Sequence, residues 1–411
     1  MNLIYNIFVY TVWFLATYYV VLILLILFVG RNRLYERKPS LGTDPMVSII
    51  VPAYNEQGKI SQTINSLKKI RHRKLEIIVI SDGSRDRTAA EARAAIGKDP
   101  RFILIDRNEN RGKAASLNEG ISMARGEFIA TMDADSVVEP GIFPKVLPYF
   151  YSDKVGAVTV AVRVKKPKTF LHRIFELEYI IGLSLMLKIF SFFNGVFVTP
   201  GPFSIYRKSL LDRIGGFDEQ NITEDLEIAY RIQKHHYKIE NCMDAKVYTI
   251  IPPTFKKLLV QRKRWYTGAL YTLAKHRDMV MNPKYGWFGY FIFFNYSLIA
   301  MGMGLFLYTT FLLGKTITRY VNYLYYTNFN LWAQVKYFDI DMLTLSRSSI
   351  LGGLALMFTI AVLIIGLYFT RTHWQKKKLG VIGYPALFFF YQLFWLVSFA
   401  AILRGKKVKW R

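Results

Sequence analysis

Four long segments without a charged residue restrict the fold of this chain more than any other feature of its sequence. They are residues 1–30, 285–314, 348–370 and 379–403. Each is long enough to cross a hydrocarbon core of about 30 Å as a helix that rises about 1.5 Å per residue. The sequence therefore predicts an N-terminal transmembrane helix, a soluble central domain and a C-terminal transmembrane region that covers residues 285–411.

The first segment, residues 1–30, is expected to be a retained anchor and not a secretory signal. No positive n-region precedes its long apolar stretch, and no A-x-A-like cleavage site follows it. Four basic residues come directly after it: Arg31, Arg33, Arg37 and Lys38. By the positive-inside rule, the central domain is expected in the cytoplasm of a multi-pass protein of the cell membrane. A single cysteine, Cys242, excludes an internal disulfide and agrees with a reducing compartment.

The topology of the C-terminal end stays open at this point. Three spans after a cytoplasmic domain would place a basic tail outside, against the positive-inside tendency. The tail residues are Arg404, Lys406, Lys407, Lys409 and Arg411. Either an interfacial or re-entrant piece within Lys315–Arg347 brings the tail back to the cytoplasmic side, or the rule fails at this end.

Two amphipathic stretches are expected to lie in the membrane interface. Residues 170–193 are strongly apolar but carry His172, Glu176 and Tyr179 on one helical stripe. Residues 251–284 have a basic side instead. Ordinary amphipathic core helices are the alternative interpretation of both. The net charge of +26 concentrates beside the apolar segments and on these stretches, so anionic lipid and a sugar diphosphate explain it better than nucleic acid.

The central residues 46–250 alternate between strand and helix patterns. The apolar strand patterns cover residues 47–52, 75–80, 102–105 and 128–132. Strands separated by helices of this length form βαβ units, and these predict a Rossmann-like, mainly parallel sheet. Ligands of such sheets bind beyond the carboxyl ends of the strands. The polar residues found there are Tyr54, Glu56, Asp82, Asp133 and Asp135.

The motif Asp133-Ala134-Asp135 predicts a metal site. Transfer of a sugar from a nucleotide releases a diphosphate, and a divalent cation neutralises the negative charge that grows on it. Mg²⁺ or Mn²⁺ takes carboxylate oxygens together with substrate phosphates. Asp135 is expected to bind the metal, and Asp133 to bind both metal and nucleotide sugar.

The segments after the first two strands are expected to bind the nucleotide. Asp82 can accept hydrogen bonds from a base or ribose, and Gly83 permits close backbone approach. Tyr54 offers an aromatic face and Glu56 a further acceptor. Lys113 begins a helix and could meet a phosphate, since helix N-termini attract anions. A plain turn and helix cap is the alternative for the segment that begins at Pro52.

Two later motifs supply candidates for catalysis. Asp225, supported by Glu224, is expected to be the general base that takes a proton from the attacking hydroxyl. A helix N-terminus capped by Thr223 is the alternative, and both can hold at once. In Gln261-x-x-Arg264-Trp265, Arg264 can pair with the leaving diphosphate, and Trp265 can support a sugar ring.

These residues resemble the motifs of the processive membrane glycosyltransferases of family 2, which include the bacterial poly-N-acetylglucosamine, cellulose, hyaluronan and chitin synthases. The matching motifs, in order, are Pro52-Ala53-Tyr54-Asn55-Glu56, Asp82, Asp133-x-Asp135, Thr223-Glu224-Asp225 and Gln261-x-x-Arg264-Trp265. The resemblance implies a GT-A fold, a nucleotide sugar with Mg²⁺ or Mn²⁺, and inversion at the anomeric carbon. It also implies that Pro52 lies in the nucleotide-sugar site and Gln261 in the catalytic site. Many members have two or more N-terminal spans, whereas one is predicted here.

The expected function is therefore an inverting, metal-assisted transfer from a UDP-sugar, such as UDP-N-acetylglucosamine, to a growing β-linked polysaccharide. The product would leave between the chain's own spans, with the bilayer and an accessory export subunit as partners. A single-sugar transferase that acts on a lipid-linked acceptor is one alternative. A transporter or receptor with a nucleotide-sensing domain is another.

Overall fold

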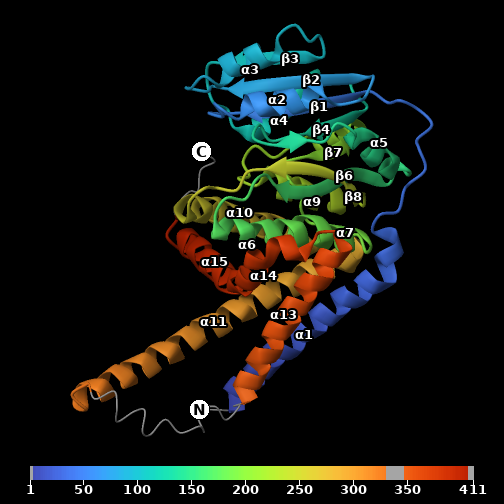
Figure 1. Cartoon of the computed structure of the whole chain (residues 1–411). Helices are drawn as coiled ribbons and strands as arrows, with labels where there is room; N and C mark the ends of the chain where they lie inside the picture. The colour runs from blue at the N-terminus through green and yellow to red at the C-terminus, as the bar shows by residue number, and fades with distance from the viewer. Residues whose placement is uncertain (1–2, 330–346, 406–411) are drawn as a thin grey trace.

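One eight-stranded sheet forms the centre of the domain that follows the N-terminal helix (Figure 1). The computed structural model describes residues 3–329 and 347–405. The strand order is β3-β2-β1-β4-β7-β6-β8-β5. The strands are β1 (Val47–Ala53), β2 (Leu75–Asp82), β3 (Phe102–Arg107), β4 (Phe128–Thr131), β5 (Val137–Val138), β6 (Val155–Val164), β7 (Ser204–Arg207) and β8 (Lys238–Thr249).

The parallel half of the sheet confirms the predicted α/β domain. β1 pairs in parallel with β2 and β4, and β2 pairs in parallel with β3. β7 then joins antiparallel to β4 and β6, while β6 and β8 run parallel. The sheet is thus mixed. Its four predicted strands lie side by side because the helices between them make the crossovers that parallel pairing requires.

Helices cover both faces of the parallel half. Alternate residues of β1 point to opposite faces, so Ile49 packs with α2 side chains such as Ile64, whereas Ile50 packs with α4 side chains such as Leu117. The helices of the domain are α2 (Ile60–Lys68), α3 (Thr88–Ile96), α4 (Lys113–Met123), α5 (Ile142–Val146), α6 (Phe170–Ile180), α7 (Leu187–Ser191), α8 (Lys208–Ile214), α9 (Glu224–Lys234) and α10 (Phe255–Lys275).

Apolar helices extend away from the domain (Figure 1). They are α1 (Leu3–Gly30), α11 (Gly286–Tyr326) and α13 (Arg347–Phe369). Two further apolar helices, α14 (Lys378–Gly383) and α15 (Leu387–Leu403), lie beside the domain. In the described part of the chain, three helical stretches are long and apolar enough to cross a membrane: Asn6–Arg33, Pro283–Tyr326 and Trp374–Leu403. A shorter apolar helix covers Leu356–Phe369.

The predicted span 379–403 is not one uninterrupted α-helix. A 3₁₀ turn, Tyr384–Ala386, separates α14 from α15. α14 packs on α6, and α15 packs on α10. Figure 1 shows α6, α10 and α15 as a layer next to the sheet, at an angle to α1 and α13. Much of the segment Lys315–Arg347, where the sequence allowed a re-entrant piece, lies outside the described residues.

The polar stripe predicted on α6 is buried. His172, Glu176 and Tyr179 are each less than 10% exposed, as are the apolar Ile174 and Phe175. α14 and β6 cover the helix, and its two acidic side chains are paired inside the molecule, Glu176 with Lys377 and Glu178 with Arg262. The segment continues beyond α6 through a π-helical turn, Ile181–Met186, into α7.

Candidate active site

The predicted polar residues meet at one edge of the sheet. β1, β2 and β4 are parallel neighbours, so the segments that follow them lie close together. Asp82 is the last residue of β2, and Asp133 and Asp135 come directly after β4. Tyr54 and Glu56 follow β1 and are half-buried. The parallel sheet therefore gathers these side chains as the sequence predicted.

The segment after β1 is tied to neighbouring helices. The backbone N–H of Glu56 donates to Thr88 Oγ1 at 2.8 Å, and its carboxylate pairs with Lys59 at 2.6 Å. Tyr54 stays partly accessible, whereas Pro52 is buried inside β1. Contact of Pro52, Tyr54 or Glu56 with a nucleotide remains a prediction.

Asp82 directs both carboxylate oxygens into its own chain. Oδ1 accepts hydrogen bonds from Arg107 Nη1 at 2.8 Å and from the backbone N–H of Arg111 at 3.0 Å. Oδ2 accepts one from the N–H of Gly112 at 2.8 Å. A Cβ at Gly83 would lie 2.4 Å from a backbone nitrogen of the same facing loop. Asp82 thus shapes the loop before α4, and its direct contact with a nucleotide remains a prediction.

Lys113 joins two acidic motifs that are far apart in sequence. Its Nζ lies 2.7 Å from Asp133 Oδ1 and 2.7 Å from Glu224 Oε1. Burial alone would lower the pKa of this ammonium, but the two carboxylates raise it above its ordinary value. A Cβ at Gly201 would lie 2.8 Å from the same Nζ. Lys113 was predicted to meet a phosphate, and here it holds two carboxylates together.

Asp135 lies in a concentration of negative charge. Burial, Asp133 and Glu56 raise the pKa of its carboxyl to about 6. The loop is held in place by Thr63 Oγ1, which lies 2.7 Å from the carbonyl oxygen of Ala134. Neighbouring carboxylates that repel each other are a setting in which a bound cation is stabilising.

The residues present fit a divalent cation shared with a substrate. Among the described residues, no three His, Cys, Asp or Glu side chains converge as a complete metal cage. Mg²⁺ is usually bound by one or two protein carboxylates and by substrate phosphates. Asp133 and Asp135 supply that smaller set.

Asp225 is the second carboxyl group with a strongly altered acidity. Burial and the neighbouring Glu224 raise its pKa to about 7, although Lys113 and Arg264 act in the opposite direction. Its Oδ2 lies 3.3 Å from the backbone N–H of Gly201. A carboxyl group with a pKa near neutrality is suited to general base catalysis.

α9, which begins at Glu224, carries Asp225 in its first turn. Thr223 is the N-cap residue, as the alternative interpretation expected, but its side chain makes no capping hydrogen bond. Its hydroxyl lies 3.1 Å from Asn221 Oδ1. The position of Asp225 is therefore set by contacts other than a side-chain cap.

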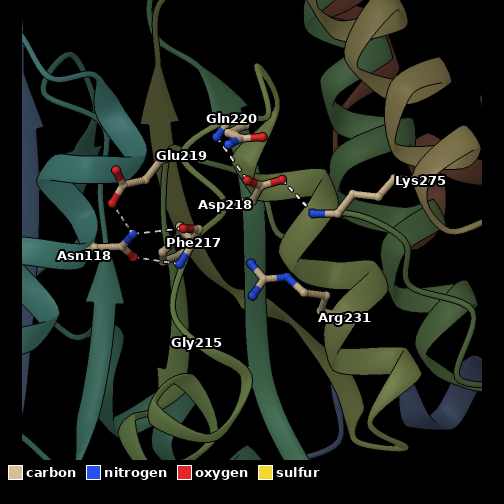
Figure 2. A pocket seen from close by; sticks show the side chains of 8 residues that line it. All are labelled: Asn118, Gly215, Phe217, Asp218, Glu219, Gln220, Arg231 and Lys275. Atoms are coloured by element: carbon tan, nitrogen blue, oxygen red, sulfur yellow. Dashed lines mark hydrogen bonds and ion pairs between the residues drawn. The ribbon is translucent and has the colours of Figure 1, made fainter.

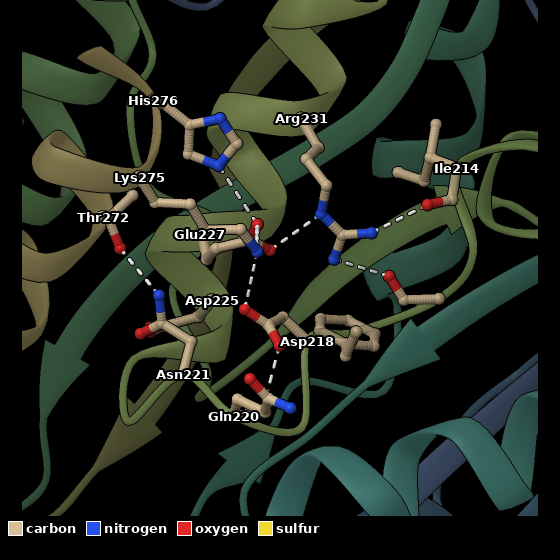
Figure 3. A network of polar contacts seen from close by, with 12 residues as sticks. Ile214, Asp218, Gln220, Asn221, Asp225, Glu227, Arg231, Thr272, Lys275 and His276 are labelled. Atoms are coloured by element: carbon tan, nitrogen blue, oxygen red, sulfur yellow. Dashed lines mark hydrogen bonds and ion pairs between the residues drawn. The ribbon is translucent and has the colours of Figure 1, made fainter.

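A cluster around the buried Glu227 fixes α9 to α10 (Figure 3). Glu227 Oε2 accepts a hydrogen bond from Arg231 Nε at 2.8 Å. Its Oε1 lies 2.9 Å from Lys275 Nζ and 3.1 Å from His276 Nε2. Lys275 also pairs with Asp218 at 2.7 Å. We call these five residues the Glu227 cluster. The sequence did not indicate this cluster, because Glu227 stands only two positions after Asp225 and looks like part of the same acidic motif.

The loop before α9 lines a hollow on the surface (Figure 2). Asn118 holds this loop from α4, since its Nδ2 donates to the carbonyl of Phe217 at 2.9 Å and its Oδ1 accepts from the same residue's N–H at 2.7 Å. The lining residues are Asn118, Gly215, Phe217, Asp218, Glu219, Gln220, Arg231 and Lys275. The hollow is lined in part by Asp218, Arg231 and Lys275 of the Glu227 cluster, and no residue of the acidic motifs lines it.

The motif Gln261-x-x-Arg264-Trp265 lies in α10, beside the acidic motifs. Arg264 lies near enough to Asp225 to lower the pKa of that carboxyl. Gly268, one turn further, lets α10 approach the loop before α9, because a Cβ there would lie 2.2 Å from Thr223 Oγ1. The structure thus brings both candidate motifs together, although Gln261 stands 36 positions after Asp225 in the sequence.

Comparison with known proteins agrees with this geometry. Residues 48–215 match the family model described as glycosyl transferase family 2. This part of the chain, which holds the parallel half of the sheet, is therefore similar to the family 2 glycosyltransferases.

Two relatives are synthases. Over 252 residues the chain is 30% identical to the poly-β-1,6-N-acetyl-D-glucosamine synthase of Staphylococcus aureus (strain MSSA476). This alignment covers 61% of this chain and 61% of that protein. Over 404 residues it is 26% identical to the protein of the same name from Staphylococcus epidermidis. This alignment covers 97% of this chain and 93% of that protein.

A solved structure shares the fold. A mannosyltransferase from Pyrobaculum calidifontis in complex with GDP-Man and Mn²⁺ aligns with a TM-score of 0.56 and 21% sequence identity. The alignment covers 78% of this chain and 94% of that chain. The predicted GT-A-type domain, combined with apolar helices, is therefore confirmed.

Proposed function

We propose that this chain is a family 2 glycosyltransferase that transfers a sugar from a UDP-sugar to a growing β-linked polysaccharide at the cytoplasmic face of a membrane. One observation carries the proposal. Lys113 places Asp133 and Glu224 2.7 Å from the same ammonium, so the motif expected to bind the donor and the motif expected to activate the acceptor form one site. Gly201, which contacts Asp133 and Asp225, adds to that support.

Donor binding uses the edge of the parallel half of the sheet. Asp133 and Asp135 would hold Mg²⁺ or Mn²⁺, which offsets the charge of the leaving diphosphate when bound. Tyr54 and Glu56 would contact the nucleotide. Arg264 supplies a guanidinium group that can pair with diphosphate oxygens through two parallel hydrogen bonds.

Acceptor activation uses Asp225. Its ionised carboxylate takes the proton of the acceptor hydroxyl while that oxygen bonds to the anomeric carbon, and the bond from that carbon to the diphosphate breaks. A single displacement of this kind inverts the anomeric centre. Glu224 keeps Lys113 in place beside the donor. Trp265 offers an apolar surface to the acceptor sugar, and Gln261 lies one turn before it on α10.

We further propose N-acetylglucosamine as the transferred sugar, because both synthase relatives carry it in their names. The apolar helices support a membrane location and export of the product between the spans, with or without a separate export subunit. A single-sugar transferase with a lipid-linked acceptor is the second candidate, favoured by the layer of α6, α10 and α15 beside the site.

Incubation of the purified full chain with a panel of UDP-sugars and Mn²⁺, followed by mass spectrometry of the products, tests this function. The expected result is a ladder of N-acetylhexosamine additions. Products with one added sugar would support the lipid-linked alternative. Donor binding without any product would overturn the transferase proposal.

The metal site is tested by Asp135→Ala. This change is expected to lower product formation at least about 100-fold, because charge stabilisation of the leaving group is lost. Asp212→Ala is the matched control, since Asp212 is exposed on α8. Full activity of the Asp135 variant, or of wild type in excess chelator, would contradict the metal role.

A further inference from the structure

A buried ion pair connects three helices next to the site. Arg262 of α10 forms two hydrogen bonds with Glu178 of α6, with Nη1 2.8 Å from Oε1 and Nη2 2.6 Å from Oε2. Tyr391 of α15 donates its hydroxyl to the same Oε1 at 2.7 Å. We call these three residues the Glu178 cluster. Arg262 and Tyr391 stand 84 and 213 positions after Glu178 in the sequence.

Burial makes this cluster sensitive to geometry. The side chain of Arg262 is 3% exposed and that of Glu178 is 11% exposed. Two charges removed from water are stabilised only if they face each other well and their remaining hydrogen-bonding capacity is used. The parallel bonds fix the plane of the guanidinium group, and the Tyr391 hydroxyl provides a third bond to the carboxylate. Among the described residues, Nε of Arg262 has no hydrogen-bond partner, so the geometry of the pair rests on these three bonds.

The fixed guanidinium supports the indole of Trp265. Arg262 lies over the Trp265 ring, 4.3 Å from its centroid, and 5.1 Å from the centroid of Phe175 on its α6 side. A cation stacked on an indole restrains both groups. The orientation of Trp265 thus depends on Arg262, which depends on Glu178.

α15 adds ring contacts to this arrangement. Tyr266 lies 4.3 Å from the ring centroid of Trp395, and Phe175 lies 6.4 Å from that of Phe394. These ring contacts place α15 along both α6 and α10. The C-terminal helix is therefore packed against the helix that carries the catalytic motif.

We propose that Glu178 and Tyr391 are positioning residues that act through Arg262 to hold Trp265 at the acceptor site. The proposal rests on the proposed function for what Trp265 does. It assigns α15 a part in acceptor binding, although no residue of α15 belongs to the motifs.

Tyr391→Phe is the first test, because it removes one hydroxyl and keeps the ring. The full-length variant is expected to have an acceptor KM about 3- to 10-fold higher, with the KM for the UDP-sugar unchanged. Tyr384→Phe is the control, since no hydrogen bond of the Tyr384 hydroxyl occurs in the described residues and the ring lies in the same part of the chain. Equal acceptor KM values in wild type and Tyr391→Phe would overturn the proposal.

An apolar replacement separates positioning from stability. Glu178→Gln leaves Arg262 without its counter-charge and is expected to lower both the unfolding temperature and activity. In Glu178→Leu/Arg262→Met, the apolar side chains should restore the unfolding temperature, as in other buried ion pairs replaced by apolar residues. The acceptor KM should stay high because the indole has lost its support. Recovery of wild-type acceptor KM together with stability would make the cluster merely structural.

Hydrogen exchange without any substrate gives a readout that does not depend on activity. In Tyr391→Phe, backbone amides in the part of α10 around Arg262 and Trp265 are expected to exchange faster than in wild type, while those of β1 are unchanged. Unchanged exchange in α10 would contradict the cluster's role. If wild type exchanges as expected but forms no product with any UDP-sugar, the proposed function fails and the positioning of α10 still stands.

Discussion

At the scale of single residues, the acidity of Asp225 makes the sharpest prediction. Its pKa is raised from 3.8 to about 7 by burial and by Glu224. A general base must be ionised, so kcat/KM should rise with pH through this range and level off above it. Profiles of kcat/KM between about pH 5 and about pH 9 measure the acid limb.

Substitutions check that this limb belongs to Asp225. Glu224→Gln removes one of the charges that raise the pKa, so the limb should move to lower pH, provided that Lys113 stays in place through Asp133. Asp225→Asn should lower kcat about 100-fold or more. An unchanged acid limb in the Glu224 variant would show that another group controls it.

Gly268 makes a steric prediction at the same scale. A methyl group there would lie 2.2 Å from Thr223 Oγ1, so Gly268→Ala should push α10 away from the loop before α9 at a cost of about 1–3 kcal/mol. Activity should fall more than stability, because moving α10 separates Arg264 from Asp225. Thr223→Ala in the Gly268→Ala background should restore part of the activity lost, whereas no recovery would contradict a steric cause.

At the scale of elements, the Glu227 cluster decides how α9 meets α10. Burial by itself raises the pKa of Glu227, but hydrogen bonds from His276, Lys275 and Arg231 outweigh it and lower the pKa to about 2. A carboxyl whose folded pKa lies below its ordinary value of 4.5 contributes stability above pH 4.5, and the contribution is lost as the pH falls toward about 2.

Glu227→Gln therefore should lower the unfolding temperature at pH 7 by several degrees, because three donors lose their buried anion. The difference from wild type should shrink as the pH falls below about 4.5, where wild-type Glu227 also begins to lose its charge. Thermal unfolding across this pH range checks both statements. Glu219→Gln is the control, as Glu219 is exposed on the neighbouring loop. A difference that grows in acid would contradict the assignment.

At the scale of the whole molecule, the packing of α15 bears on which side of the membrane the basic C-terminal tail lies. α15 has 17 residues, which span about 26 Å as a helix. It lies against α10, and its rings Phe390 and Phe394 contact Phe175 of α6. We propose that α14 and α15 stay at the cytoplasmic interface and that α1, α11 and α13 cross the membrane. Arg404 then lies inside, in agreement with the positive-inside tendency.

Cysteine labelling tests this topology. Cys242 is buried and the chain has no other cysteine, so Cys242→Ser provides a background for single additions. Arg404→Cys should react with a membrane-impermeant maleimide only after cells are opened. Tyr326→Cys, at the far end of α11, should react in intact cells. Labelling of Arg404→Cys in intact cells would show that α15 crosses the bilayer.

Much of the parallel half of the fold could be predicted from the sequence because its signals are local. A buried parallel strand needs an unbroken apolar run such as residues 75–80, and a turn must follow it. Acidic residues after those runs, Asp82, Asp133 and Asp135, therefore had to reach the same edge of the sheet. The apolar segments were equally visible, since membrane length and absence of charge can be counted along the chain.

Tertiary structure alone decided how these parts are joined. Lys113 lies between Asp133 and Glu224, Glu227 binds the end of α10, and Glu178 meets Tyr391 across 213 positions of sequence. No spacing rule predicts such contacts, because each depends on which helix faces pack after the sheet has formed. The sequence by itself determined which acidic side chains follow the strands. The packing of α9, α10 and α15 decided the acidity of Asp225 and the support of Trp265, since both depend on charges and rings brought from distant segments.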